Sequence, residues 1–433
     1  MNIHHQKTLL PNGLTLVSVQ MPHLQSALLS VYVRVGSRHE STETNGISHL
    51  LEHLFFRGSH RFPDARKMNL AIEWVGGSLN AVTMRDLSYY YTACHPKGLE
   101  KALHILGNML AAPKLSKLSV EKQIVLEEML DEVDDKGEDI DLDNLSKMQL
   151  FKGHPLSFKI AGTPQSLAHI SKKQLLSHYK RHYVAANMVL GVASPLPCDK
   201  VIRAATKAFA HLPRGERIQE TPPKPPPKGP RLLYVPRAES QLLFRLSFLT
   251  VPENHKDALL LHILQRILDD GLSSWLPFEV VEKRGLAYSV ETLLEGFSDV
   301  GIFNVDSAAT PSRAPQVVEC ILKTLAKLAD FKLPVEELRR AKRRKQMQLE
   351  FAKDSPGELL SRLAATELFY SPESFEARAK RIQKIKTKEL VSFARNLFCK
   401  ENLWVVAVGP QKDKAAFAKA IRNSPIPHTK ILR

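Results

Sequence analysis

The sequence predicts an α+β protein with two homologous domains, each a mostly antiparallel sheet with helices packed on one face. A proline-rich run lies near the middle of the 433-residue chain. On either side of it, alternating and helical hydrophobic patterns recur in the same order. Hairpin-like strand pairs favour antiparallel sheets, and the helical stretches supply the layer that covers them.

The proline-rich run covers residues 220–230, ETPPKPPPKGP, and holds six prolines in eleven positions. Such a run excludes a helix and favours extended polyproline II, which acts as a semi-rigid spacer. We therefore predict an N-terminal domain at 1–219, a linker at 220–230 and a C-terminal domain at 231–433.

Each half is expected to run through two strands, a helix, a strand pair, an amphipathic helix, long helical stretches and a closing strand. In the first half the patterns fall at Leu14–Val19, Ala27–Val35, Gly46–Phe56, Ser78–Ala93, Lys97–Leu110 and Met188–Ala193. In the second half they fall at Arg231–Val235, Gln241–Leu249, Lys256–Asp269, Ala287–Ser307, Pro315–Leu328 and Asn402–Val408. The repeated order indicates an internal duplication.

Composition narrows the class of protein. Hydrophobic residues make up 43% and charged residues 24%, which is typical of globular proteins. The net charge of +16 suits either a nucleic-acid partner or a basic surface over another activity. No stretch approaches about 18 uninterrupted apolar residues, so we expect no membrane-spanning helix.

The N-terminal residues have neither the pattern of a secretory signal nor the Arg- and Ser-rich composition of an organellar presequence. The four cysteines are far apart and form no CxxC pair, which indicates reduced thiols. We expect a cytoplasmic protein and rank a periplasmic location second.

The segment His49-Leu50-Leu51-Glu52-His53 carries the strongest chemical signal. It lies in a helical context, where Thr44 and Asn45 are candidate caps. At i and i+4 the two imidazoles project from one helix face and can share a zinc ion. Glu52 lies beside the metal position without binding it, and there it can accept and return a proton. This order of residues is the inverzincin motif.

A catalytic zinc ion needs a third protein ligand. A second predicted helix, Val120–Glu132, offers Glu121, Glu127 and Glu128. Spacing alone does not choose among them, and a Glu-rich helix can equally be a solvated face.

At this point the chain resembles the M16, or pitrilysin, family of zinc peptidases. It is most similar to the short-subunit branch that includes mitochondrial processing peptidase and small bacterial relatives. The similar segments are GISHLLEHLFFRGS (46–59), GGSLNAVTMRDLSYYY (76–91), EKQIVLEEM (121–129), IAGTPQSL (160–167) and EKRGLAYSV (282–290). The resemblance implies the LuxS-like metallopeptidase fold, repeated in both halves, and one zinc ion per chain.

The resemblance also implies roles for individual residues. Glu128 matches the third zinc ligand, and Glu121 matches a carboxylate that orients a ligating histidine. Glu127 is then structural. Glu52 matches the catalytic base.

The strand around Ser78–Thr83 matches the family's substrate-pairing edge strand. Asn80 and Ala81 match its peptide-contacting pair, so an extended peptide is expected to bind by strand addition.

The second half departs from the family pattern. In the second half of family members, an Arg seven residues before a Tyr grips the substrate or stabilises the reacting carbonyl. Here the Tyr is Tyr288 and the Arg position holds Val281, which cannot donate a charge-assisted hydrogen bond. Neighbouring Arg284 is out of register, and Tyr288 alone suits either substrate contact or packing. The resemblance therefore implies a related subunit that supplies the Arg/Tyr pair, with a homodimer as the alternative.

The leading hypothesis is a zinc endopeptidase that holds extended or unfolded peptides in a two-subunit chamber. The alternative is a non-catalytic M16-like assembly subunit. Net charge alone supports a nucleic-acid binder, which we do not expect. Two charged runs stay open: the acidic run 131–144 either lines the chamber or is a solvated loop, and the basic run 339–345 lies on a predicted surface helix.

Overall fold

The computed structural model describes residues 4–330 and 333–428, which form two compact units. Unit 1 contains the chain up to Glu132 together with His154–Thr221 and Glu350–Pro372. Unit 2 contains Val133–Gly153, Pro222–Leu349 and the chain from Glu373 onward. The predicted domains are continuous in sequence, whereas these units are not. Residues 133–153, from the first half of the chain, belong to unit 2, and residues 350–372, from the second half, belong to unit 1. We call these two stretches the exchanged segments.

Unit 1 is built on a six-stranded sheet in the order β1-β2-β6-β3-β5-β4. Strands β2 and β6 are parallel, and every other neighbouring pair is antiparallel. The strands are β1 (His4–Leu9), β2 (Thr15–Gln20), β3 (Ala27–Val33), β4 (Asn80–Thr83), β5 (Ser88–Cys94) and β6 (Met188–Ser194). The short strand β4 therefore forms one edge of the sheet.

Unit 2 repeats this topology with five strands in the order β7-β11-β8-β10-β9. Strands β7 and β11 are parallel, and the others are antiparallel. The strands are β7 (Arg231–Pro236), β8 (Leu242–Thr250), β9 (Val290–Gly296), β10 (Gly301–Ala309) and β11 (Trp404–Gly409). Strands β2 to β6 correspond in order to β7 to β11, so the predicted duplicated α+β fold is confirmed.

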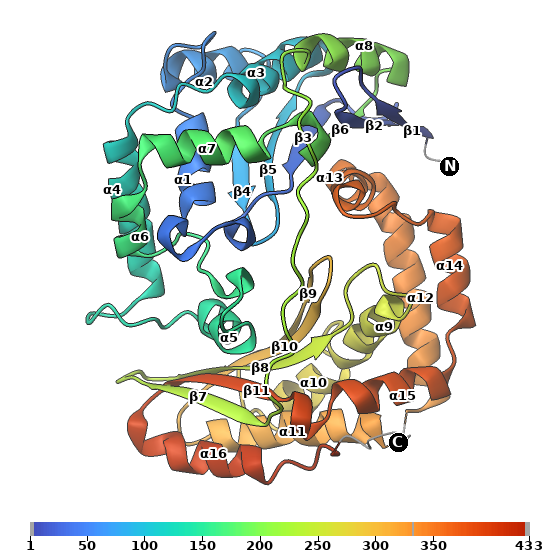
Figure 1. Cartoon of the computed structure of the whole chain (residues 1–433). Coiled ribbons are helices and arrows are strands. Elements are labelled where there is room, and N and C mark those ends of the chain that lie inside the picture. Colours follow the sequence, from blue (N-terminus) through green and yellow to red (C-terminus); the bar gives the residue numbers. More distant parts are fainter. Residues whose placement is uncertain (1–3, 331–332, 429–433) are drawn as a thin grey trace. The chain divides into compact units, whose positions relative to one another are not determined.

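Helices connect these strands in a repeated order (Figure 1). Those of unit 1 are α1 (Ile47–Phe55), α2 (Ala65–Glu73), α3 (Leu99–Ala111), α4 (Leu118–Glu128), α6 (Pro164–His169), α7 (Lys172–His182), α8 (Cys198–Ala208) and α13 (Pro356–Leu360). The others are α5 (Leu142–Leu150), α9 (Ala258–Leu268), α10 (Trp275–Pro277), α11 (Ala314–Ala329), α12 (Val335–Phe351), α14 (Phe375–Lys384), α15 (Thr387–Leu397) and α16 (Lys414–Arg422). The helix predicted at Val120–Glu132 ends at Glu128, and Met129–Glu132 is a 3₁₀ turn.

Each exchanged segment packs on a sheet. In unit 1, α13 and the turn after it lie against β6, where Gly191 leaves the necessary space. A Cβ atom at Gly191 would lie 2.9 Å from Ala364 Cβ and 3.1 Å from Leu360 Cδ2. In unit 2, Leu145 of α5 packs with two valines of β11.

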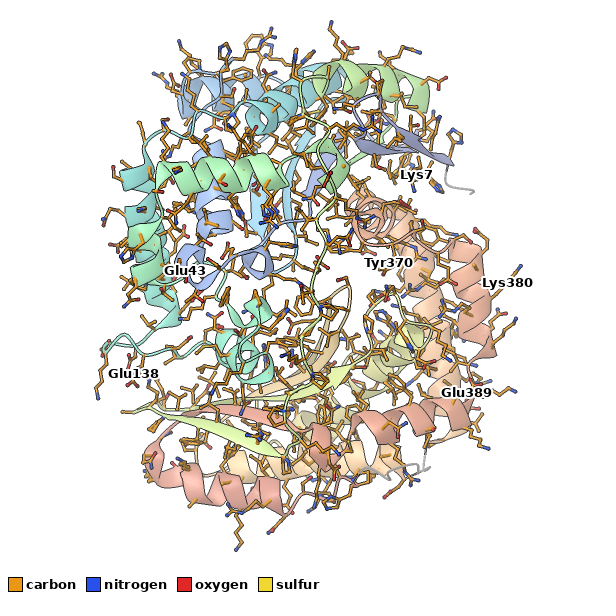
Figure 2. All side chains as sticks on the ribbon, in the orientation of Figure 1. Lys7, Glu43, Glu138, Tyr370, Lys380 and Glu389 are labelled. Carbon is orange, nitrogen blue, oxygen red and sulfur yellow. The ribbon has the colours of Figure 1, made fainter. Side chains whose placement is uncertain are left out.

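The acidic run 131–144 is partly bound within unit 2. Asp134 pairs with Arg237, and the Asp143 carboxylate lies 2.8 Å from Arg245 and 2.9 Å from the fully buried Lys147. Asp141 caps α5 by accepting from Asn144 N at 2.7 Å. These acids hold the exchanged segment on its sheet, whereas Glu138 is exposed on the loop before α5 (Figure 2).

The basic run 339–345 lies on α12, as expected, and most of its side chains have partners on the protein. Arg339, Arg340 and Arg344 pair with carboxylates at 2.6–2.7 Å. Lys342 donates to Gln383 O at 2.9 Å. Most of the basic side chains in this run therefore have a partner within the protein itself.

The proline-rich linker has no helix or strand between residues 221 and 230. Its first residue, Glu220, is bound by Arg34 at 2.8 and 2.6 Å, and its end is bound where Gly229 N donates to Glu401 O at 2.7 Å. The four cysteines are buried and form no disulfide with one another. Among the described residues, no helix combines the length and apolar character needed to cross a bilayer.

Candidate metal centre

Helix α1 carries the predicted motif and is held by its apolar side. Leu50, Leu51 and Leu54 are fully buried in the core of unit 1. His49 and His53 lie on the other side, and each side chain keeps 17% of its surface exposed. The i, i+4 spacing brings the two rings within 4.7 Å, centroid to centroid.

The first turn of α1 is capped by Glu40, a residue that no sequence signal indicates. Its buried carboxylate accepts hydrogen bonds from Gly46 N at 2.7 Å, Ser48 N at 2.8 Å and Asn45 Nδ2 at 2.9 Å. It therefore satisfies free N–H groups at the positive end of the helix. The expectation that Thr44 or Asn45 caps α1 is wrong, because Asn45 instead supports Glu40.

Gly46 explains why the IAGT segment packs against this helix start. Its backbone is left-handed, with φ of 92°. A Cβ atom there would lie 2.3 Å from Ala161 O. Only glycine fits both requirements without strain.

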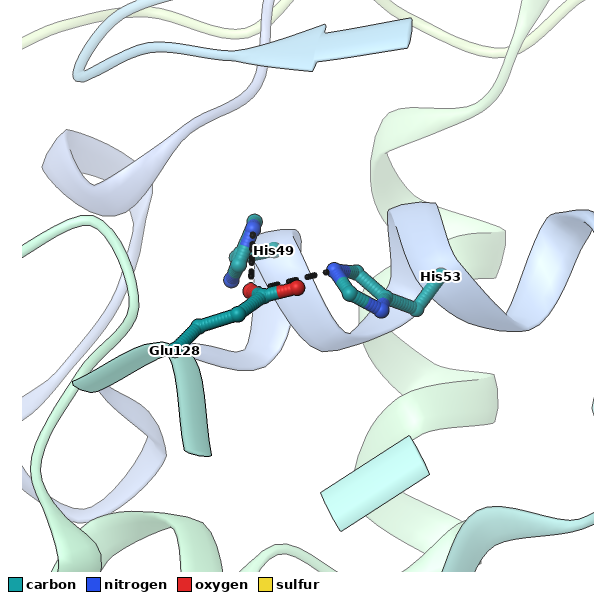
Figure 3. Close-up of side chains that lie close together, drawn as sticks. All are labelled: His49, His53 and Glu128. Atoms are coloured by element: carbon teal, nitrogen blue, oxygen red, sulfur yellow. Dashed lines mark ion pairs between the residues drawn. The ribbon is translucent and has the colours of Figure 1, made fainter. Parts of the chain in front are cut away.

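The structure brings His49, His53 and Glu128 together (Figure 3). Their donor atoms all lie within 4.8 Å of one another. Glu128 Oε2 is 3.7 Å from His49 Nε2 and 3.5 Å from His53 Nε2. Glu128 is the last residue of α4, which packs on α1. Of the other two carboxylates on this helix, Glu127 is exposed and does not belong to the group.

These donors suit a zinc ion. Two imidazoles and one carboxylate form a known catalytic ligand set, and bonds of about 2.0–2.2 Å from each donor are compatible with this spacing. Ligating imidazoles must be neutral. Burial, and to a smaller extent His53, lowers the pKa of His49 to about 4, which favours its neutral form.

Glu121 fixes the orientation of His53. Its side chain is 2% exposed, and Oε2 accepts from His53 Nδ1 at 3.3 Å. Its other oxygen accepts from Arg57 Nε. Because Nδ1 carries the proton, Nε2 has the free lone pair that can bind a metal, and Nε2 is the atom that faces Glu128. The resemblance predicts this role for Glu121, whereas no sequence signal indicates Arg57, which lies in the turn after α1, four residues beyond His53.

Glu52 points from α1 to strand β4. Its Oε2 accepts a hydrogen bond from Thr83 Oγ1. Burial raises the pKa of Glu52, and the hydrogen bond from Thr83 opposes that shift. Glu52 is not one of the grouped donors, in agreement with a role beside the metal.

Asn80 and Ala81 begin the edge strand β4. Within the described residues β4 pairs only with β5, through Asn80↔Tyr91, Ala81↔Tyr90, Val82↔Tyr89 and Thr83↔Ser88. Asn80 Nδ2 donates to Ser78, and Ala81 packs on the core. The outer side of β4 is therefore the unpaired edge of this sheet.

Tyr288 lies in unit 2, on the loop before β9, and is 94% exposed. Packing thus does not explain this side chain. Val281 packs on the core of unit 2, and Arg284 donates to the backbone oxygen and the carboxylate of Glu279. Arg284 is thereby engaged within its own unit.

Three histidines behind α1 were also missed. His178 Nε2 lies 3.0 Å from Ser48 Oγ, and the His178 and His182 rings are 4.4 Å apart. His39 faces His182 at 5.6 Å. Burial is the main cause that lowers the pKa of all three, to about 3 for His178 and about 2 for His182. His178 and His182 lie on α7 and His39 lies on the 3₁₀ turn Ser37–His39, and the contact of His178 with Ser48 joins α7 to α1.

The fold and the site together define a class: a duplicated α+β protein whose first half brings two histidines of α1 and a glutamate of α4 together. Comparison of the sequence with known protein families and relatives identifies the same class. Residues 15–164 match the pattern of insulinase (peptidase family M16), and residues 169–345 match the peptidase M16 inactive domain. An uncharacterized zinc protease of Mycobacterium leprae is 30% identical, over 96% of this chain and 94% of that protein. The chain belongs to the M16 peptidase family.

Solved structures share the fold. The crystal structure of a protease from Helicobacter pylori has a TM-score of 0.86 at 23% identity and covers 94% of this chain and 100% of that one. A chain in complex III2 from Candida albicans, with Inz-5 bound, has a TM-score of 0.79 at 18% identity, with 96% and 99% covered. The same architecture therefore occurs in a protease and in a chain of complex III2.

Proposed function

We propose that this chain is a zinc-dependent endopeptidase that cleaves extended or unfolded peptides. The observation that carries the proposal is the convergence of His49, His53 and Glu128, with Glu52 next to them on α1. When bound, a zinc ion polarises the scissile carbonyl and lowers the pKa of water. The family membership and the names of the relatives support this chemistry.

The chain's own residues divide the remaining work. Glu52 takes a proton from the attacking water and returns it to the leaving amine. Its raised pKa suits a carboxyl that must hold this proton between the two transfers. Glu121 keeps His53 in the orientation that presents Nε2. Strand β4 offers its unpaired edge, at Asn80 and Ala81, to the backbone of the peptide.

The second part of the proposal concerns assembly. Val281 occupies the position at which the family has its substrate-gripping Arg, and Arg284 is engaged by Glu279. We therefore infer that a related subunit supplies the Arg/Tyr pair and completes a two-subunit chamber, with a homodimer as the alternative. The isolated chain should bind zinc and cleave poorly.

A non-catalytic assembly subunit is the second candidate, favoured by the fold similarity to a chain of the Candida complex. An intact His-His-Glu group supports the peptidase over it, since an assembly role does not need that group.

Metal analysis separates the two functions. Protein purified without chelator should contain about one zinc ion per chain, and His49→Ala should lose it. Glu127→Gln, which alters an exposed carboxylate beside the site, is the matched control and should keep the metal. A wild-type chain that fails to bind zinc under these conditions would contradict the peptidase proposal. Full cleavage by the isolated monomer would contradict the heterodimer.

A further inference from the structure

The hydrogen bond between Thr83 and Glu52 joins two elements with different tasks. Thr83 is the last residue of β4, and Glu52 lies 31 residues earlier on α1. Thr83 is buried, at 8% exposure, so its hydroxyl is largely shielded from solvent. The bond therefore links the edge strand directly to the proposed base.

Ser88 lies behind the Thr83 hydroxyl without donating to it, because its single hydrogen goes to Val35 O. The two residues are register partners across β4 and β5, and Ser88 Oγ is 3.4 Å from Thr83 Oγ1. Ser88 is fully buried and also lies 2.9 Å from Val35 O. A threonine hydroxyl has one hydrogen, and here that hydrogen goes to Glu52 Oε2. The β-branched side chain restricts χ1, so this direction is fixed by the strand.

We infer that Thr83 is a positioning residue for Glu52, an inference that rests on the proposed endopeptidase function. Its hydroxyl engages Oε2 and holds the carboxylate so that Oε1 is the oxygen that exchanges the proton. Because Thr83 belongs to the strand that a peptide would extend, Glu52 is held beside that strand before a peptide binds.

A purely structural role for Thr83 makes a different prediction. A buried hydroxyl that only satisfies its own hydrogen bonding contributes to stability and not to turnover. Its loss would lower the melting temperature and leave the turnover of the folded enzyme unchanged. Turnover and Glu52 geometry in folded variants therefore distinguish the two roles.

The test compares Thr83→Val, which keeps the shape and removes the hydroxyl, with Thr83→Ser, which keeps the hydroxyl. Both are produced in the native host so that any partner subunit co-purifies, and zinc content is measured first. We expect Thr83→Val to lower kcat by about 10–100-fold with KM within about twofold, as for lost supporting contacts in active sites. Thr83→Ser should recover kcat to within about threefold of wild type.

Crystal structures of the metal-free variants supply a readout that does not depend on activity. Glu52 should keep its position in wild type and Thr83→Ser and leave it in Thr83→Val. An unmoved Glu52 in folded Thr83→Val, or a wild-type kcat for that variant, would overturn the inference. A wild-type assembly that binds zinc but cleaves no peptide would instead refute the proposed function, and the structures would still decide the role of Thr83.

Discussion

Helices α1 and α9 occupy equivalent places in the two units, but their polar side chains make different contacts. Each follows a central strand and precedes the edge strand, β4 in unit 1 and β9 in unit 2. Both bury an apolar face in their own core. In α9 the polar side chains are occupied by neighbours in unit 2: His262 lies 3.0 Å from Glu253 Oε1, and Gln265 donates to Thr292 O of β9 at 3.0 Å.

The difference shows which part of the site the fold supplies. In both units a side chain of the helix is hydrogen-bonded to a residue of the edge strand: Glu52 accepts from the Thr83 hydroxyl in unit 1, and Gln265 donates to the backbone oxygen of Thr292 in unit 2. The scaffold thus fixes a contact between helix and edge strand, while the residue type decides the chemistry. A carboxylate can move a proton there, and an amide cannot.

Glu52→Gln is expected to have the largest effect on activity. It replaces the carboxylate of α1 with an amide, the group that Gln265 carries in α9. We expect kcat to fall by about 10²–10⁴-fold, the range attributed to general acid–base catalysis, with zinc retained. Peptide cleavage and metal content measure the two effects. Gln265→Ala is the matched control in α9 and should leave kcat unchanged. Retained cleavage by Glu52→Gln would exclude Glu52 as the base.

Glu121→Gln tests whether the carboxylate bonded to His53 raises the affinity of the site for zinc. It weakens the acceptor for His53 Nδ1 and removes the charge that faces Arg57. Loss of such outer partners reduces metal affinity by about 10–100-fold. Competition with a chelator of known affinity measures this change.

The control for that measurement is again Glu127→Gln, since Glu127 is exposed on the same helix. Equal zinc affinity of Glu121→Gln and wild type would mean that Glu121 only stabilises the helix pair.

The sequence was enough for the fold class and for the helix that carries His49 and His53, because hydrophobic periodicity and the HxxEH spacing are local signals. It did not choose among Glu121, Glu127 and Glu128, since all three lie on one helix; the resemblance made that choice. Thr83 and Arg57 escaped notice because their partners lie 31 and 64 residues away. The exchanged segments were missed for the same reason, since packing on a distant sheet leaves no periodic mark in the sequence.

Glu40 marks a further difference between the two helices, and it gives the smallest of the expected effects. Helix α1 has a buried carboxylate on its first N–H groups, whereas α9 starts at Asp257 without a side-chain cap. Glu40→Ala leaves these donors and Asn45 without their acceptor. Loss of a cap or of a buried acceptor costs about 1–3 kcal/mol of unfolding free energy.

Denaturant unfolding of the metal-free protein measures this cost without interference from zinc binding. Glu43→Ala, an exposed change three residues along the chain, is the control and should stay within about 0.5 kcal/mol of wild type (Figure 2). If Glu40→Ala were as stable as this control, the carboxylate would not be holding the helix start. In that case the apolar face of α1 alone would have to hold His49, which lies in the first turn of the helix.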